Sequence, residues 1–201
     1  ERYFPGGGVA SATVFYRHVQ DLIRNRTTLE TVSWATAPRY VSRPVNFDSA
    51  DTFGLELEAR GRAGTLLPFA FDPKTPLDVR ASVNFYESRV KGVPGPDNRL
   101  DRQQPWSGTL GLDYVLSGVI PAPIRLGGSV SFTPGYRTQQ TTEQSIEFAR
   151  SRTIDLYANV PISPKISVRF IANNVAPFAS ENTTAYANQS ATYTVSKPRT
   201  W

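Results

Sequence analysis

The sequence predicts an all-β protein whose antiparallel strands run up and down in succession. Three observations support this fold class: apolar and polar residues alternate, the alternating segments are about ten residues long, and turn-forming residues separate them. Side chains of a strand point to opposite faces with a period of two, so each segment has one apolar face and one ionic face. No stretch of useful length shows helical periodicity, and none approaches the roughly 18 consecutive apolar residues of a membrane-spanning helix.

Taken in chain order, the alternation and the turn residues predict about eight strands. The clearest is 51–62, in which Phe53 and Leu55 share one face while Glu56 and Glu58 share the other. The predicted spans are 8–19, 51–62, 76–88, 106–117, 124–137, 147–160, 165–175 and 190–201. Several reach the ten or so residues with which a tilted strand crosses a bilayer.

The connections between these spans alternate in character. Residues 20–50, 89–105, 138–146 and 176–189 are mostly long and polar, whereas 63–75, 118–123 and 161–164 are mostly shorter and rich in Pro and Gly. Since consecutive antiparallel strands place alternate connections at opposite ends of a sheet, the long set collects at one end and the short set at the other. This polarity is typical of outer-membrane barrels, although 63–75 would be a long, apolar turn at the short end.

The apolar face carries residues such as Val14, Leu57, Val83, Leu112 and Phe170. No Lys or Arg lies in the middle of this face, as expected of a surface that meets hydrocarbon, where such a charge costs about 2–4 kcal/mol. Aromatic residues recur near the strand ends, where they suit either a membrane interface or the rim of a soluble core. Alternation by itself therefore permits both a membrane wall and a soluble β-sandwich.

The opposite face carries charges of both signs, which can pair across strands with about 0.2–1 kcal/mol per pair. Its candidate lumen-facing residues are Arg17, Glu56, Glu58, Arg60, Asp78, Arg80, Asp113, Arg125, Asp155 and Arg169. The pattern suits the wet or protein-filled lumen of a large barrel, and it equally suits the solvated outside of a sandwich.

Composition argues against several functions. The 201 residues include 22 Lys and Arg and 17 Asp and Glu, and Arg is interleaved with acidic residues along the chain, so no nucleic-acid partner is expected. There is no Cys, and His18 is the only His, which leaves no His-rich metal site and no catalytic triad. Glu56 and Glu58 suit an ion pair with Arg60 or Arg80 better than acid–base chemistry. We expect no enzyme activity and no cofactor.

The long connections hold the candidate ligand contacts. These residues are Trp34, Arg39, Tyr40 and Arg43 in the longest connection, and Arg99, Arg102 and Trp106 in another. Guanidinium and aromatic groups could grip an anionic, partly aromatic ligand such as an iron chelate. The same Arg residues could instead meet anionic lipopolysaccharide at the outer rim.

Four segments, in this order, resemble the C-terminal part of the barrel of a TonB-dependent outer-membrane receptor. Residues 12–23 resemble the strand that opens the late barrel, and 50–58 resemble the recurrent Gly-apolar-Glu strand of this family. Residues 98–106, followed by 111–114, resemble a loop-to-strand signature. Residues 169–175 are similar to the penultimate strand. The likeness covers essentially the whole chain.

The resemblance implies that residues 1–201 are a C-terminal segment of about seven or eight strands from a 22-stranded transmembrane barrel of the bacterial outer membrane. The plug domain would lie upstream, and 197–201 would enter the last strand. Such a segment is a passive wall of an active importer of a siderophore, cobalamin, carbohydrate or similar scarce nutrient. Its partners would be outer-membrane lipid and lipopolysaccharide, the remaining barrel strands, the plug, and TonB through that plug.

Two other functions are compatible with the alternating pattern. The first is a soluble β-sandwich that binds a ligand such as a carbohydrate. The second is a small outer-membrane barrel that stands alone as a channel or adhesin. Stability in solution without detergent would favour the sandwich, whereas a plug-like upstream domain would favour the receptor.

Overall fold

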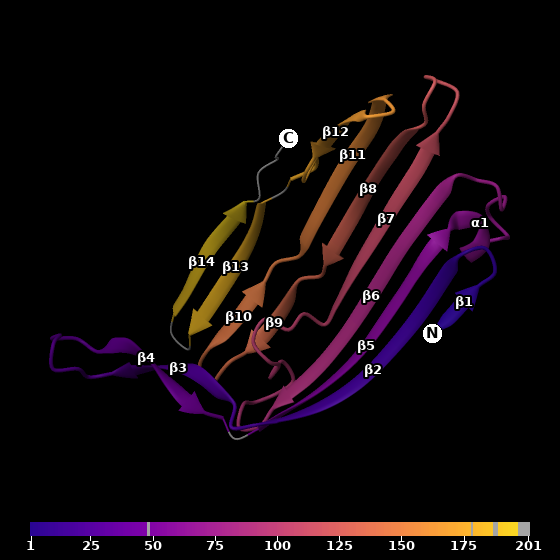
Figure 1. Ribbon diagram of the computed structural model, residues 1–201. Coiled ribbons are helices and arrows are strands. Elements are labelled where there is room, and N and C mark those ends of the chain that lie inside the picture. The colour runs from indigo at the N-terminus through magenta and orange to yellow at the C-terminus, as the bar shows by residue number, and fades with distance from the viewer. Residues whose placement is uncertain (48, 178, 187–188, 197–201) are drawn as a thin grey trace.

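The computed structural model describes residues 1–47, 49–177, 179–186 and 189–196, which form a curved, antiparallel β-structure (Figure 1). Its strands are β1 Arg2–Phe4, β2 Gly8–Gln20, β3 Ile23–Glu30, β4 Arg39–Asn46, β5 Ser49–Arg62, β6 Leu77–Val90, β7 Trp106–Leu116, β8 Ile124–Thr133, β9 Tyr136–Gln139, β10 Ser145–Phe148, β11 Ser151–Ser163, β12 Ile166–Ala172, β13 Ala179–Tyr186 and β14 Gln189–Ser196. A short helix, α1, spans Ala63–Leu66. Among the described residues, no helix is long and apolar enough to span a membrane.

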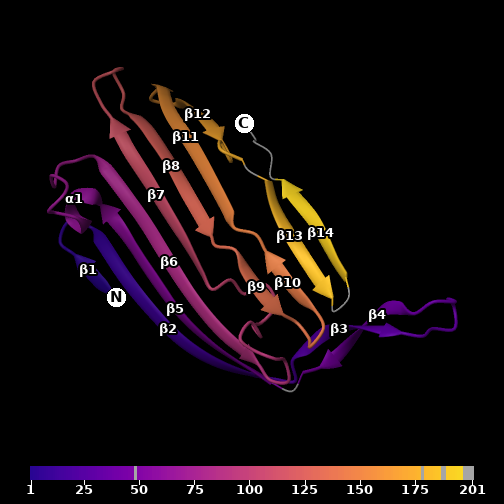
Figure 2. The ribbon, with the colours of Figure 1, turned by 180° about the vertical axis from the view of Figure 1, so that it is seen from behind.

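The main sheet has eight strands in the order β1-β2-β5-β6-β7-β8-β11-β12, and every neighbouring pair is antiparallel. A four-stranded sheet, β14-β13-β10-β9, and the hairpin β3-β4 complete the strand pairing. Figures 1 and 2 show β9, β10 and β13 beyond the ends of β8, β11 and β12, so long up-and-down strands continue past a break. Because β1 and β12 lie at opposite edges, the described sheet is open.

The strand register aligns like residues in rows across the sheet. Leu55 pairs with Val14 on β2 and with Phe85 on β6, whereas the next residue, Glu56, pairs with Asn84. Paired residues on neighbouring strands point to the same face. The apolar rows and the ionic rows therefore lie on opposite faces, as the alternation predicts.

The apolar face is exposed. Val14 retains 63% of its accessible surface and Phe170 retains 62%, while the buried apolar residues in the described part of the chain are Ala50, Ala63, Val90 and Val93. A β-sandwich buries its apolar face against a second sheet. The described strands consequently do not form a sandwich.

A small apolar cluster lies at the end of the sheet that carries the long connections. Buried Ala50, Val90 and Val93 pack there against residues that include Phe47 and Leu100. The backbone N–H of Phe47 also donates to the carbonyl of Leu22, at 2.7 Å. These contacts fix the base of the β3-β4 hairpin and of the connection between β6 and β7, and thereby position both segments.

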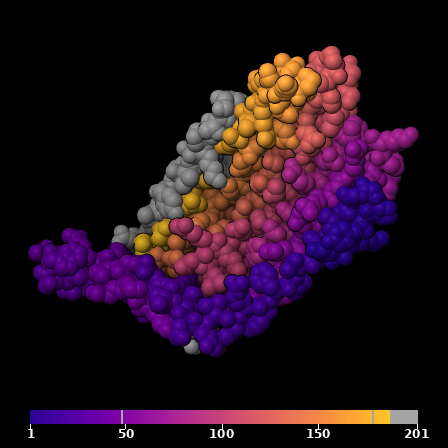
Figure 3. Space-filling model, in the orientation of Figure 1, coloured from indigo at the N-terminus to yellow at the C-terminus, as the bar shows by residue number. Residues whose placement is uncertain are grey.

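The prediction that 20–50 and 176–189 are mostly connections was wrong, because they contain the β3-β4 hairpin and β13. In the hairpin, neighbouring residues such as Arg24, Asn25 and Arg26 are polar on both faces, so the alternation that identifies the other strands is missing. The pairing of the two backbones, and not burial of one face, makes this hairpin. It projects beyond the body of the molecule (Figure 3).

Three predicted spans also need correction. The span 124–137 is interrupted at 134–135, where Pro134 has no N–H to donate to the ladder. The span 147–160 is interrupted at 149–150, and the span 165–175 ends at Ala172. In the last predicted span, β14 covers 189–196, and 197–201 lie outside the described residues.

The connection 63–75 is the apolar turn that the sequence predicts, but it begins with the unexpected helix α1. Ala63 is fully buried in this turn. Gly64 permits a close chain crossing, because a Cβ at this position would collide with the backbone of Asp72 and Pro73. The turn is therefore compact although Phe69 is exposed.

Candidate functional site

The ten predicted lumen residues share one face of the main sheet. Strand register aligns Glu58 with Ser82, Arg60 with Arg80, and Asp78 with Asp113, and it carries the same face onward to β12. On this face lie Arg17 of β2, Glu56, Glu58 and Arg60 of β5, Asp78 and Arg80 of β6, Asp113 of β7, Arg125 of β8, Asp155 of β11 and Arg169 of β12. The polar surface is thus continuous across neighbouring strands.

Several members of this face bind one another. Arg80 Nη2 donates to Asp113 Oδ2 at 2.8 Å, and the Asp113 carboxylate is buried while the Arg80 side chain is mostly exposed. The Tyr86 hydroxyl donates to Glu56 Oε1 at 2.9 Å. The Arg169 guanidinium lies 4.7 Å from the centroid of the Tyr157 ring. These contacts order the face as a network of side chains. The predicted ion pair of Glu56 with Arg80 was wrong, because Arg80 binds Asp113 and Glu56 accepts from Tyr86 instead.

Aromatic rings on this face cover glycines. The Tyr157 ring occupies the space above Gly127, where a Cβ would also lie 2.7 Å from Asp113 Oδ1. The Phe15 ring covers Gly54 in the same way. A side chain at either glycine would displace the ring, so these glycines allow the large side chains to lie flat along the sheet.

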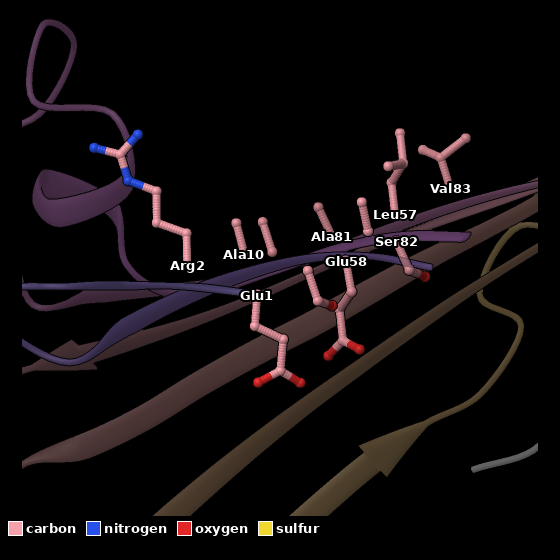
Figure 4. A pocket seen from close by; sticks show the side chains of 11 residues that line it. Glu1, Arg2, Ala10, Leu57, Glu58, Ala81, Ser82 and Val83 are labelled. Carbon is pink, nitrogen blue, oxygen red and sulfur yellow. The ribbon is translucent and has the colours of Figure 1, made fainter. Parts of the chain in front are cut away.

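A groove of about 570 Å³ crosses the edge of the sheet at β1, β2, β5 and β6. Figure 4 shows Leu57 and Val83 on one side of the strands and Glu58 and Ser82 on the other. Ala10, Ala59 and Ala81 are aligned in register on the apolar face. Their side chains are short, so a depression forms between the larger side chains around them. The groove is therefore mainly a feature of the apolar surface, although the charged residues Glu1, Arg2 and Glu58 are also among those that line it.

A second cavity, of about 480 Å³, lies at the end with the long connections, and we call it the polar pocket. Its lining comes from β3 and β4, from the connection between β6 and β7, and from β9, β10 and the loop between them. Its lining includes Arg24, Asp101, Arg102, Thr138, Gln144 and Phe148. Segments far apart in the sequence therefore meet here.

Three polar residues of this pocket are well buried, whereas Asp101 and Arg102 are exposed. Arg24 retains 5% of its accessible surface, Thr138 retains 1% and Gln144 retains 7%. Arg24 Nη2 binds Asp101 Oδ1, which also accepts from Gln140 Nε2 at 3.3 Å. However, Nε and Nη1 of Arg24, Oγ1 of Thr138 and Oε1 of Gln144 have no hydrogen-bond partner. Buried polar groups normally have one.

The predicted loop residues mostly lie elsewhere. Arg43 pairs with Glu30 across the β3-β4 hairpin at 3.1 Å, and this hydrogen bond, helped by one from Thr28, lowers the pKa of Glu30. The Tyr40 ring lies 4.9 Å from the ring of Tyr186 on β13. Trp34 and Arg39 are exposed on the hairpin. These residues are not brought together in one cavity.

In the other connection, Arg99 Nη1 donates to the carbonyl of Tyr86 at 3.1 Å. Trp106 belongs to the first position of β7, not to the loop, and its ring lies 5.3 Å from Phe132. Arg102 is the one predicted loop residue that lines the polar pocket. Sequence reasoning missed Arg24, Thr138 and Gln144, because Arg24 lies more than 100 residues from the other two and no motif or spacing links them.

Within the part of the chain that the structure describes, no group of three or more His, Cys, Asp or Glu residues could hold a metal ion. The pocket instead presents hydrogen-bond donors and acceptors with one apolar wall.

A family model described as TonB dependent receptor-like, beta-barrel, matches residues 2–175. Searches of curated proteins and of solved structures found no match. Members of the matched family are transporters of the bacterial outer membrane that take up nutrients, and they are not enzymes. The antiparallel strands, the exposed apolar face and the family match agree, and the chain belongs to the TonB-dependent receptor family as part of its β-barrel.

Proposed function

We propose that this chain is the C-terminal wall of an importer that is driven through TonB. Its apolar face contacts the lipid and lipopolysaccharide of the outer membrane, and its ionic face lines the lumen. The observation that carries the proposal is the separation of exposed apolar and ionic surfaces on the two faces of one sheet. No second layer covers the described apolar face. Placing the ionic face toward the lumen avoids the cost of about 2–4 kcal/mol for each Lys or Arg in hydrocarbon.

Aromatic residues on the apolar face support this orientation. Tyr16 and Phe53 are paired and exposed near the long-connection end of β2 and β5. The Tyr16 hydroxyl donates to Asp51 Oδ1 at 2.5 Å, so the ring can rest among apolar chains while its hydroxyl stays in a polar layer. This arrangement suits a membrane–water interface. The long connections would then face the outside of the cell, and the short turns the periplasm.

The open edges support a larger barrel. Unpaired strand edges cannot face hydrocarbon, because backbone N–H and C=O groups need partners there. We infer that further strands of the same protein pair with the two sides of the sheet, and that a plug domain occupies the lumen and transmits force from TonB. The cargo would be a scarce nutrient such as a siderophore, cobalamin or a carbohydrate.

A nitroxide test separates the two faces. Leu57→Cys and Glu58→Cys are made in the full-length receptor after any other cysteine has been replaced; residues 1–201 contain none. Each is spin-labelled in outer membranes, and its collisions with oxygen and with a water-soluble nickel chelate are compared. We expect oxygen to dominate at position 57 and nickel at position 58, because these neighbours lie on opposite faces (Figure 4).

The reverse pattern would refute the proposed orientation of the wall. Equal access of the nickel chelate at both positions would refute a membrane location for this part of the sheet. Heat-dependent electrophoretic mobility would show that each labelled receptor is folded, so a loss of structure cannot imitate either result.

A further inference from the structure

The groove of about 570 Å³ on the apolar face lies next to an arginine, and we call it the alanine groove. Its floor is a row of alanines that are aligned in register, namely Ala10, Ala59 and Ala81. Register also aligns Arg2 of β1 with Ala10, so Arg2 belongs to the same row and the same face. Figure 4 shows the Arg2 side chain on the side of Leu57, whereas Glu1 points the other way.

Arg2 forms no ion pair among the residues that the structure describes. Its side chain is exposed, and its guanidinium carbon lies 5.2 Å from the centroid of the Phe4 ring on the same face. The neighbouring carboxylate of Glu1 instead accepts from the Tyr3 hydroxyl at 2.6 Å. An exposed cation beside an apolar groove fits an amphiphile that has an anionic head and an apolar tail.

Arg2 lies close to the end of the sheet that carries the short turns. It precedes Phe4, the last residue of β1, by two positions, whereas Leu110 of the same row precedes the last residue of β7 by six. Two positions correspond to ~7 Å along the strand and, at a tilt of about 40°, to ~5 Å of membrane depth. An Arg costs much less there than at the midplane, and its long side chain can keep the guanidinium among the headgroups.

The connection 63–75 covers the apolar face at this same end. Gly8 lies on that face between Ala10 and the turn, and a Cβ at Gly8 would lie 3.3 Å from Leu66 Cδ2 and 3.4 Å from Thr65 Cγ2. The connection therefore bends over the apolar side of β2, and Phe69 beyond α1 is 87% exposed. Exposed aromatic groups on the lipid side suit the boundary between headgroups and acyl chains.

We propose that a glycerophospholipid of the periplasmic leaflet binds at this end of the wall, with its phosphate on Arg2 and one acyl chain in the alanine groove. The inference rests on the proposed wall function, and it adds to general lipid contact one headgroup site at one residue. A guanidinium donates two parallel hydrogen bonds to phosphate oxygens. Since the short turns face the periplasm in the proposed orientation, the phosphate within reach is that of a phospholipid and not that of lipopolysaccharide.

Photolabelling of the full-length receptor tests this site. The receptor is placed in phosphatidylcholine vesicles with a small fraction of phosphatidylglycerol that carries a diazirine in one acyl chain. A second sample contains diacylglycerol with the same photoreactive chain and no phosphate. Labelled peptides are identified by mass spectrometry, and the labelling of Ala10 and Ala59 is divided by that of Leu156, which is exposed on the apolar face of β11 and reports general lipid contact.

Phosphatidylglycerol should label the groove about fivefold more than diacylglycerol does, the factor expected for one Arg near an anionic lipid. Arg2→Gln should remove this difference. Arg60→Gln is the matched control and should preserve it, because Arg60 is exposed beside the same row but lies on the ionic face.

A second variant tests the acyl chain separately from the headgroup. Ala59→Phe fills the groove and should lower the labelling of Ala10 by both lipids severalfold, so the proposal stays testable if Arg2→Gln fails to fold. Heat-dependent electrophoretic mobility identifies the folded variants.

The inference is overturned if the two lipids label the groove equally, if Arg2→Gln behaves like Arg60→Gln, or if Ala59→Phe leaves the labelling of Ala10 unchanged. Failure of the wall proposal has a different signature, because neither lipid would then label Leu156 and the nitroxide at position 57 would collide with the nickel chelate. The expected nitroxide pattern together with equal labelling by the two lipids would refute the phospholipid site alone.

Discussion

Replacing Leu110 with Arg places a charge near the middle of the apolar face. Leu110 is aligned with Ala81 on β6 and Val130 on β8, and 43% of its surface is exposed. From Trp106 to Leu116, β7 advances ~34 Å at ~3.4 Å per residue, which a tilt of about 40° reduces to ~26 Å of membrane depth. This height matches the apolar band of about 25 Å in such barrels, and Leu110 then lies within ~3 Å of its midplane.

The depth determines the expected magnitude. An Arg on the lipid face costs about 2–4 kcal/mol at the midplane. That range corresponds to a factor of roughly 30 to 800 in the folding equilibrium, since about 1.4 kcal/mol is tenfold. The adjacent Thr109 points to the ionic face, where its Oγ1 lies 3.1 Å from Ser131 Oγ. Thr109→Arg should cost about 1 kcal/mol, the value of that lost hydrogen bond.

The measurement is reversible denaturant unfolding of the full-length receptor in phospholipid vesicles, followed by tryptophan fluorescence. Leu110→Arg and Thr109→Arg are compared with the parent protein at equal vesicle concentration. A penalty for Thr109→Arg that equals or exceeds the penalty for Leu110→Arg would refute the assignment of the apolar face to lipid. Equal slopes of the unfolding curves would show that the comparison concerns stability alone.

Two further predictions concern the ionic face and the hairpin. Gly127→Ala should lower the free energy of unfolding by about 1–3 kcal/mol, because the added methyl group collides with the Tyr157 ring. The same substitution should cost less in a Tyr157→Ala background. If the two substitutions lower the free energy of unfolding additively, the collision with Tyr157 is not the cause. The hydrogen bond from Arg43 lowers the pKa of Glu30 in the folded hairpin. At pH values above the pKa of Glu30 in the unfolded chain, about 4.3, the pair therefore stabilises the hairpin of residues 23–46. This stabilisation is lost as the pH falls through the lowered pKa of the folded state. Hydrogen exchange of 23–46, corrected for intrinsic rates, should accelerate on acidification in the parent and much less in Arg43→Gln; identical acid responses would exclude the pair as the cause.

The main strands were predictable because the alternation of apolar and polar residues that identifies each strand lies within the strand itself. The span predicted as 51–62 is Ser49–Arg62 in the structure, and the one predicted as 8–19 is Gly8–Gln20. In both, the residues of one face are apolar and those of the other are polar. The β3-β4 hairpin could not be found in this way, because it is exposed along most of its length and gains no apolar face from its position.

The candidate site was predictable only in part. Once the apolar residues of a strand are identified, the alternation of side chains assigns its charged residues to the opposite face. The ten candidate lumen residues could therefore be assigned to a common face before the strand pairing was known. The polar pocket depends on how three connections fold over one another. Of the residues that line it, Arg102 alone was predicted as a ligand contact, and Arg24 was not among the candidates.

By itself, the sequence determined that this protein has an antiparallel sheet with an apolar and an ionic side, since strand geometry imposes a period of two on every extended segment. Tertiary structure alone decided that Arg24, Asp101, Thr138 and Gln144 meet in one cavity. The physical reason is that the hairpin reaches across the ends of neighbouring strands, and contacts between such distant segments leave no periodic trace in the chain.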